Sequence, residues 1–187
     1  DSIEKETIPI LKKNRDKYDF DIQEVKKEEI DKTLEVSSSA IREKVKTGEF
    51  SHANKMLGYK FYLDGIVEEG DGIGKTIDFP TANITSSESS KILPGDGVYA
   101  ANVNVDTEKL SGMVNIGFRP TVKGKDRRIE LHIFNFNRNI YGKTLRIIFN
   151  SKIRDEIMFK NIKELKKQLE KDKIESIKLL NNEKIRN

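Results

Sequence analysis

Oxygen-bearing side chains follow a glycine-rich turn in the segment GDGIGKTIDFPTANI, residues 70–84. Pro80 fixes its own backbone φ angle and favours an extended conformation for the residue before it. If the chain continues in an extended form, Thr81 and Asn83 point to the same side. A hydroxyl and an amide oxygen are hard ligands, which Mg²⁺ prefers together with phosphate oxygens and water. The spacing therefore allows a Mg²⁺–nucleotide site, although Thr and Asn in such turns more often bond only the backbone.

The glycines of this turn, Gly70, Gly72 and Gly74, match neither of the two common phosphate-binding templates. A Walker A loop that ends in Gly74-Lys75 requires a glycine at position 69, where the sequence has glutamate. The dinucleotide fingerprint that begins at Gly70 requires a glycine at position 75, which is lysine. Judged by glycine spacing alone, the turn is most simply a connection between strands.

Glu130 is the second chemical candidate, because it lies in the alternating segment RRIELHIFNFN, residues 127–137. Ile129 and Leu131 define one face of the expected strand, so Glu130 and His132 lie on the other. A strand glutamate is usually solvated or paired with a nearby arginine, here at position 127 or 128. If its face borders a pocket, however, Glu130 is placed to accept a proton. With only two histidines in the chain, no histidine-based metal motif is recognisable.

The elements that must position these residues are mainly β-strands. Alternation of apolar and polar residues predicts strands in five segments, 61–67, 99–105, 114–118, 127–137 and 145–149. A hairpin turn is expected at 137–143 and a polar loop at 123–128. Several short strands separated by turns indicate an all-β barrel or sandwich.

Helices are expected on both sides of these strands. One spans 37–48 with a serine start and a glycine stop, and a second spans 51–58 with Ser51 as its N-cap. A short strand is expected at 19–25. A long amphipathic helix follows Asn161, which can form a capping arrangement with Glu164. Its apolar stripe is expected to consist of Ile162, Leu165, Leu169, Ile177 and Leu180.

Composition narrows the possible classes of protein. The 187 residues contain no cysteine, which excludes disulfides and thiolate chemistry. No apolar run approaches the length of a membrane span, about 18 residues, and the first residues lack the form of a signal peptide. Residues 151–187 carry 11 basic and 7 acidic residues, which accounts for the net charge of +4 and favours a solvated helix over a nucleic-acid surface. We expect a cytoplasmic protein without a membrane or nucleic-acid partner.

Five segments in the same order resemble the riboflavin kinase module of the bacterial bifunctional riboflavin kinase/FAD synthetase family. They are GKTIDFPTANI, LPGDGVYAANV, GMVNIGFRPT, IELHIFNFNRNIYGKTLRIIF and IRDEIMFKNIKELKKQLEKD. The resemblance runs from about Leu57 to Leu180. It implies a six-stranded Greek-key barrel with a C-terminal amphipathic helix, and transfer of the ATP γ-phosphoryl group to the 5′-hydroxyl of riboflavin. The products would be FMN and ADP.

The same resemblance implies roles for particular residues. Thr81 and Asn83 match the family's Mg²⁺–ATP ligands, and Glu130 matches its general base. The segment from Gly70 through Gly72 to Gly74 matches the loop that covers the nucleotide phosphates, where Lys75 adds positive charge and Pro80 belongs to the nucleotide-binding motif. The expected partners are thus riboflavin, ATP and Mg²⁺.

The first part of the chain resembles the other half of that family. VSSSAIR, residues 36–42, is similar to a segment near the end of the adenylyltransferase domain, whose His-x-Gly-His motif is absent here. We therefore expect residues 1–50 to be the α/β tail of a truncated FMN adenylyltransferase domain, with linker helices to about 58. The riboflavin kinase barrel and helix would occupy 57–187. No FAD synthetase activity is expected from the chain.

One departure from the family pattern leaves a second reading open. Asp78 stands where the family usually has glycine. Its carboxylate would repel phosphates unless it faces away or joins the metal shell, so a weakened affinity for ATP is a hypothesis. The alternative to a kinase is therefore a module that binds flavin or nucleotide without turnover. Among oligomeric states, the monomer is slightly favoured.

Overall fold

The computed structural model describes residues 2–23, 29–31, 34–69, 73–121 and 124–186. The chain divides into two compact units, Asp1–Glu35 and Val36–Asn187. The first unit contains helix α1 (Ser2–Tyr18) and the antiparallel strands β1 (Glu29–Asp31) and β2 (Leu34–Glu35). The strand expected at 19–25 is wrong over residues 19–23, and its last two residues lie outside the described part.

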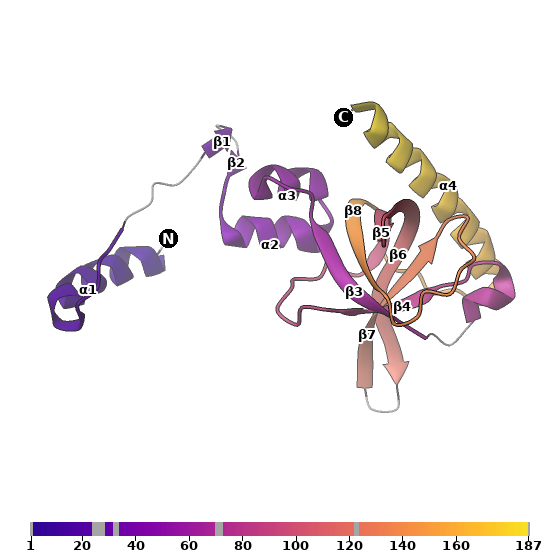
Figure 1. Cartoon of the computed structure of the whole chain (residues 1–187), viewed down its shortest axis with the longest axis horizontal. Helices are drawn as coiled ribbons and strands as arrows, with labels where there is room; N and C mark the ends of the chain where they lie inside the picture. The colour runs from indigo at the N-terminus through magenta and orange to yellow at the C-terminus, as the bar shows by residue number, and fades with distance from the viewer. Residues whose placement is uncertain (1, 24–28, 32–33, 70–72, 122–123, 187) are drawn as a thin grey trace. The chain divides into compact units, whose positions relative to one another are not determined.

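The second unit is a closed antiparallel barrel of six strands in the order β3-β4-β7-β6-β5-β8 (Figure 1). Strands β5, β6 and β7 follow one another as neighbours, and β8 returns to lie beside β5, which is the Greek-key arrangement. The prediction of a six-stranded Greek-key barrel is therefore confirmed. The strands are β3 (Tyr62–Glu68), β4 (Ala82–Ser86), β5 (Gly97–Val105), β6 (Glu108–Thr121), β7 (Gly124–Ile133) and β8 (Thr144–Arg154).

The interior of the barrel is filled by the apolar residues whose alternation predicted the strands. Each strand contributes to one hydrophobic core, and large members such as Leu63, Tyr99, Leu131 and Phe149 are almost fully buried. Because successive strand residues point to opposite faces, polar residues between them lie on the outer face. Any polar site on these strands is thus on the outside of the barrel.

Two loop predictions are wrong. Residues 137–143 do not close a hairpin, because β7 and β8 are not neighbours and this segment instead bonds β3 through Val67. Residues 124–128, expected in a polar loop, belong to β7 and pair with β6, whereas residue 123 lies outside the described part. In this part of β7 no apolar residue alternates with the polar ones, so the sequence pattern gave no strand signal.

Helices α2 (Ser38–Thr47) and α3 (Phe50–Leu57) precede the barrel. Ser37 caps α2 by accepting a hydrogen bond from the backbone of Ala40, and glycines end both helices as expected. Ser51 is not the N-cap of α3, because the helix already begins at Phe50. The Phe50 ring packs against three aromatic rings, so burial of this side chain decides where the helix begins. The rings belong to Phe61, Tyr99 and Phe149.

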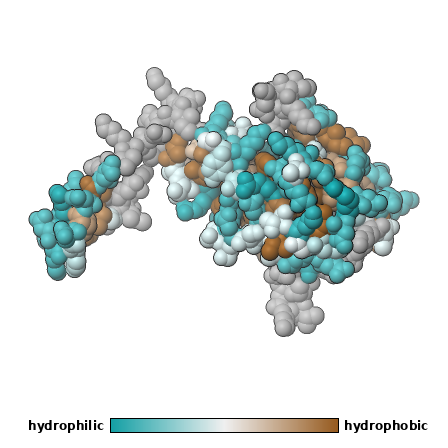
Figure 2. All heavy atoms as spheres, in the orientation of Figure 1, coloured by the Kyte–Doolittle hydropathy of each residue, from teal (hydrophilic) through white to brown (hydrophobic). Residues whose placement is uncertain are grey.

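The closing helix α4 (Ile162–Arg186) packs on the outer face of β5, β6 and β8 (Figure 1). Asn161 and Glu164 form the expected reciprocal capping contacts. The predicted stripe is only partly correct, because Ile162 and Ile177 remain 58% and 39% exposed. Leucines of α4 do pack on the barrel, namely Leu165, Leu169, Leu179 and Leu180. Figure 2 shows other hydrophobic side chains at the surface along this helix.

Candidate active site

The pairing of β4 with β7 places Asn83 directly opposite Glu130. On its other side, Glu130 is opposite Asn115 of β6, and Asn83 is opposite Glu68 of β3. Side chains of directly opposite residues share a face, with Cβ atoms about 5 Å apart. Four adjacent strands thus form a row of polar side chains on the outer face, which we call the polar row: Glu68, Asn83, Glu130 and Asn115.

The Glu130 side chain is half-buried in this row. Among the residues that the structure describes, none forms a hydrogen bond or ion pair with its carboxylate. The expected alternative of a pair with Arg127 is wrong, because that guanidinium lies 3.0 Å from the Asp96 carboxylate and also donates to the Pro94 carbonyl. Within the described residues, the Glu130 carboxylate therefore has no partner that would prevent it from accepting a proton.

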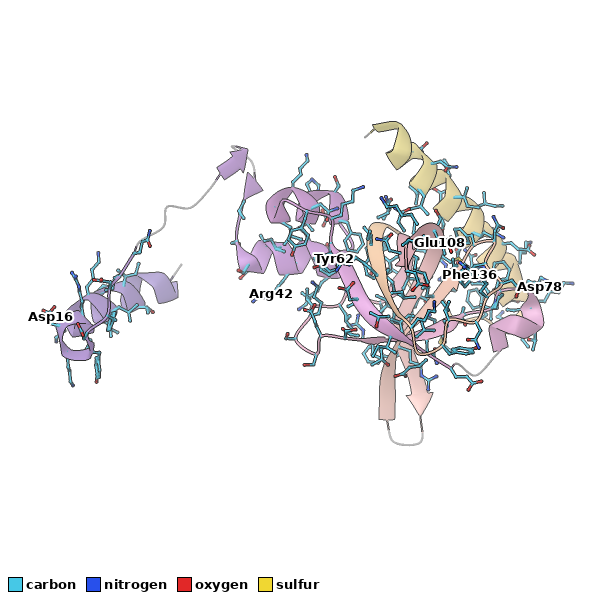
Figure 3. The ribbon with its side chains drawn as sticks, viewed as in Figure 1. Asp16, Arg42, Tyr62, Asp78, Glu108 and Phe136 are labelled. Atoms are coloured by element: carbon cyan, nitrogen blue, oxygen red, sulfur yellow. The ribbon has the colours of Figure 1, made fainter. Side chains whose placement is uncertain are left out.

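Pro80 and Thr81 lie just before β4 and line a pocket of ≈ 300 Å³. The opposite wall consists of residues 136–141, and Leu131 and Ile133 contribute from β7. Figure 3 labels Phe136 of this wall. The structure thus brings Asn83 and Glu130 together as neighbours and places Thr81 in a pocket whose lining includes neither of them. Within the described part of the chain, nothing bonds the Thr81 hydroxyl, and the Asn83 amide nitrogen makes only a long contact of 3.4 Å with the Glu69 carbonyl.

The segment before Pro80 folds back tightly on the glycine-rich turn. The Phe79 amide donates to the Gly74 carbonyl at 2.9 Å. A Cβ atom at Gly74 would lie 2.1 Å from the Phe79 carbonyl oxygen, so this approach requires glycine. Gly70, Gly72 and the side chain of Lys75 lie outside what the structure describes, and their expected contact with phosphates stays a prediction.

Asp78 occupies a position that suits glycine, because its φ angle of 65° lies in the left-handed region. Its carboxylate, labelled in Figure 3, accepts a hydrogen bond from Lys166 of α4 at 2.7 Å. The hydrogen bond from Lys166 lowers the pKa of Asp78 below its ordinary value. The negative charge is thus held by a cation of α4, which weakens the physical basis of the phosphate-repulsion hypothesis.

His132 contributes a contact that the sequence did not predict. Its ring is 6% exposed, and Nδ1 lies 2.8 Å from the Pro80 carbonyl oxygen. Burial lowers the pKa of His132 below its ordinary value. The ring also contacts Phe79 and Phe134, at centroid distances of 5.2 and 5.7 Å.

The sequence also did not predict that the carboxylate of Glu156 lies near the polar row. A Cβ atom at Gly117 would lie 1.7 Å from Oε1 of Glu156, so the Glu156 carboxylate lies directly on the Gly117 backbone. Gly117 follows Asn115 by two residues on β6 and therefore shares its face. The glycine within a strand was the available signal, since such glycines often mark close approach of another group.

Metal binding here would depend on oxygen ligands other than a carboxylate cluster. Across the described ranges, no group of three or more His, Cys, Asp or Glu residues is arranged to hold a metal ion. Nor does any helix in those ranges have both the length and the apolar character needed to cross a membrane. The Thr81 hydroxyl and the Asn83 amide oxygen remain the candidate ligands.

The fold and this site define an antiparallel Greek-key barrel with a row of polar side chains on its outer face and a pocket lined by Pro80 and Thr81. The family model described as "Flavokinase: Riboflavin kinase" matches residues 57–180. The chain therefore belongs to the riboflavin kinase family.

Named relatives agree with this assignment. The bifunctional riboflavin kinase/FMN adenylyltransferase of Bacillus subtilis is 42% identical over 150 residues, covering 79% of this chain and 47% of that protein. The Haemophilus influenzae protein of the same name is 41% identical over 138 residues, covering 73% of this chain and 44% of that protein. The chain thus spans about half the length of the curated relatives it matches.

A solved structure with the same fold bears a different name. It is described as a macrolide-efflux protein from Streptococcus pneumoniae, with a TM-score of 0.71 and 34% sequence identity. The similarity covers 76% of this chain and 47% of that one.

Proposed function

We propose that the chain is a riboflavin kinase, which transfers the γ-phosphoryl group of ATP to the 5′-hydroxyl of riboflavin. The observation that carries the proposal is the direct pairing of Asn83 with Glu130, with Thr81 two residues before Asn83 in the chain. In a member of the riboflavin kinase family, this pairing joins a candidate metal ligand to a candidate base. Residues 57–187 would form the kinase module, and the assignment of residues 1–50 stays a prediction.

Glu130 would act as the proton acceptor. Its carboxylate takes the proton of the riboflavin 5′-hydroxyl as that oxygen forms a bond to the γ-phosphorus. The bond between the γ-phosphorus and the β,γ-bridging oxygen breaks, so ADP leaves with that oxygen. Deprotonated FMN and ADP are the products, and Glu130 later returns its proton to water. Phosphoryl transfer needs little more covalent help than this, because positioning and charge stabilisation dominate.

The nucleotide would lie along the Thr81 pocket. Its volume of ≈ 300 Å³ is at the lower end of ligand sites, and its walls combine apolar residues with polar ones. Thr81 and Asn83 would hold Mg²⁺ with the phosphates, since both oxygens are hard ligands and neither is bonded by another described residue. The bound metal supplies charge neutralisation on the phosphates.

The decisive experiment measures riboflavin-dependent ADP release and FMN formation for the wild type and Glu130→Gln. Loss of a general base typically costs about 10²–10⁴-fold in turnover, so we expect Glu130→Gln to be at least 100-fold slower. Glu88→Gln is the control, because it removes the charge of an exposed glutamate beyond the other end of β4. Equal rates for Glu130→Gln and the wild type would exclude Glu130 as the base. Riboflavin binding without any ADP release by the wild type would instead identify a module that binds without turnover.

A further inference from the structure

We propose that His132 is a positioning residue, which holds the Pro80–Thr81 segment against β7 so that Thr81 faces the nucleotide site. The proposal rests on the proposed kinase function, because that function makes Thr81 part of a nucleotide site. The contact between His132 and Pro80 does not depend on it. The Nδ1 atom of His132 lies 2.8 Å from the Pro80 carbonyl oxygen, one residue before Thr81. No role in the reaction was assigned to this histidine by the sequence.

The contact between His132 and Pro80 lies directly beyond the last main-chain pair of β4 and β7. The β4–β7 pairs are Asn83 with Glu130 and Ala82 with Leu131, and β4 begins at Ala82. The next residue of β7 is His132, and its side chain bonds the chain just beyond the strand. Pro80 has no backbone N–H to extend the ladder. The His132 side chain therefore replaces the missing main-chain connection between the two strands.

The chemistry of this bond is fixed by its acceptor. A carbonyl oxygen only accepts, so the Nδ1 atom of His132 must carry the hydrogen. Burial lowers the pKa of His132, which favours the uncharged form of the ring. Phe79 and Phe134 flank the ring, so water has little access to the bond. A hydrogen bond in such surroundings is costly to lose, since its partner is then left unsatisfied.

The consequence for the site is a fixed relation between two groups. Glu130 and His132 lie on the same face of one strand, two residues apart. Because His132 is on the same strand as Glu130, its hydrogen bond holds Thr81 in a fixed position relative to the proposed base. Without this bond, we expect the Thr81 side of the site to move while the polar row keeps its place, because Glu130 is paired on both sides by β4 and β6.

Three substitutions separate the hydrogen bond from the ring. In asparagine, the amide nitrogen is attached to Cγ, as Nδ1 is in histidine, so His132→Asn can still donate to Pro80. In His132→Gln the amide is one bond further out and serves as the matched control. His132→Phe keeps an aromatic ring between Phe79 and Phe134 but has no donor. The other histidine of the chain, His52, lies 50% exposed on α3, and His52→Asn controls for histidine replacement as such.

The test measures binding of Mg²⁺–ADP by calorimetry and of riboflavin by flavin fluorescence, on the full chain and without turnover. We expect His132→Phe and His132→Gln to bind Mg²⁺–ADP roughly tenfold more weakly than the wild type, which is the loss expected for one buried hydrogen bond. His132→Asn should recover most of that loss. Riboflavin affinity should change less than twofold in all three, and His52→Asn should match the wild type.

Two results would overturn the proposal. Equal Mg²⁺–ADP affinity for His132→Asn and His132→Gln would show that the donor at the Nδ1 position has no effect on the nucleotide site, even if His132→Phe fails to fold. Parallel losses of riboflavin and nucleotide affinity would show that His132 only stabilises the barrel. Because neither readout needs phosphoryl transfer, absence of kinase activity in the wild type would refute the proposed function without deciding this proposal.

Discussion

Asp172 of α4 places a carboxylate inside the contact between this helix and the barrel. Its side chain is 1% exposed, and it receives hydrogen bonds from the Arg154 guanidinium, at 2.7 Å from Nη2 and 3.0 Å from Nε, and from the Gln168 amide at 2.8 Å. Arg154 is the last residue of β8, and its side chain is only 15% exposed. The pair therefore joins the last strand to the helix at a site that water hardly reaches.

Replacement of Asp172 by alanine should be strongly destabilising. Removing one partner of a buried ion pair leaves the other charge uncompensated, which typically costs about 3–5 kcal/mol. In Asp172→Ala the one hydrogen bond that the Arg154 guanidinium would keep among the described residues is that to the Asp155 carbonyl, at 2.9 Å. Conversely, the double variant with leucine at both positions should recover much of the loss, because no charge then remains buried.

The chain contains a matched control for this experiment. Asp64 is likewise paired with one arginine, Arg146, through two hydrogen bonds at 2.7 and 2.8 Å. Its side chain is 26% exposed and that of Arg146 is 44% exposed, so Asp64→Ala should cost only about 0–1 kcal/mol. Both arginines contact their carboxylate through Nε and Nη2, whereas the burial of the two pairs differs.

The assay is urea unfolding followed by circular dichroism, with free energies obtained by linear extrapolation and the slopes compared between variants. We expect the free energy of unfolding of Asp172→Ala to lie at least 2 kcal/mol below that of Asp64→Ala, from the difference between buried and exposed pairs. Equal losses in the two variants would refute the reasoning, because burial would then have no influence on the cost of breaking the pair.

Two further predictions concern Tyr99 and Asp78. Burial raises the pKa of Tyr99 from 10.0 to about 12. Because the pKa is higher in the folded state, the contribution of Tyr99 to the stability of the fold is complete below pH 10 and is lost as the pH rises toward 12. Tyr99→Phe should therefore remove this part of the alkaline loss of stability, as measured by thermal unfolding across that range. An unchanged pH profile would contradict the prediction. Asp78→Gly should unfold at a higher temperature than Asp78→Ala, because alanine at a φ angle of 65° costs about 1–2 kcal/mol that glycine avoids; equal midpoints would exclude backbone strain at this position.

The barrel was predictable because its interior is uniformly apolar. Leu63, Val103 and Val105 alternate with polar residues along their strands, and the period of two indicates the buried face directly. The same reasoning failed for 137–143, since a turn between two strands in sequence does not determine which strands become neighbours. It also failed for the inner face of α4, where Asp172 is buried and a pattern of apolar residues cannot indicate it.

The candidate site was predictable only in part. Resemblance to a family singled out Thr81, Asn83 and Glu130, and the structure places the last two opposite each other. Spacing could not predict this, because the two residues lie far apart in the sequence and only the β4–β7 register brings them together. The contact of His132 with Pro80 depends on the same register and on a side-chain rotamer, neither of which a sequence pattern specifies.

The two halves of the site are held in place by different kinds of interaction. Glu130 belongs to the central part of a sheet, where main-chain pairing to β4 and β6 fixes it on both sides. Thr81 precedes its strand and depends on a few local contacts, chiefly those of His132 with Pro80 and of Phe79 with Gly74. Local contacts of this kind open at a lower free energy than a closed barrel unfolds. Substitutions around the start of β4 should therefore alter the use of ATP well before they alter the use of riboflavin or the stability of the fold.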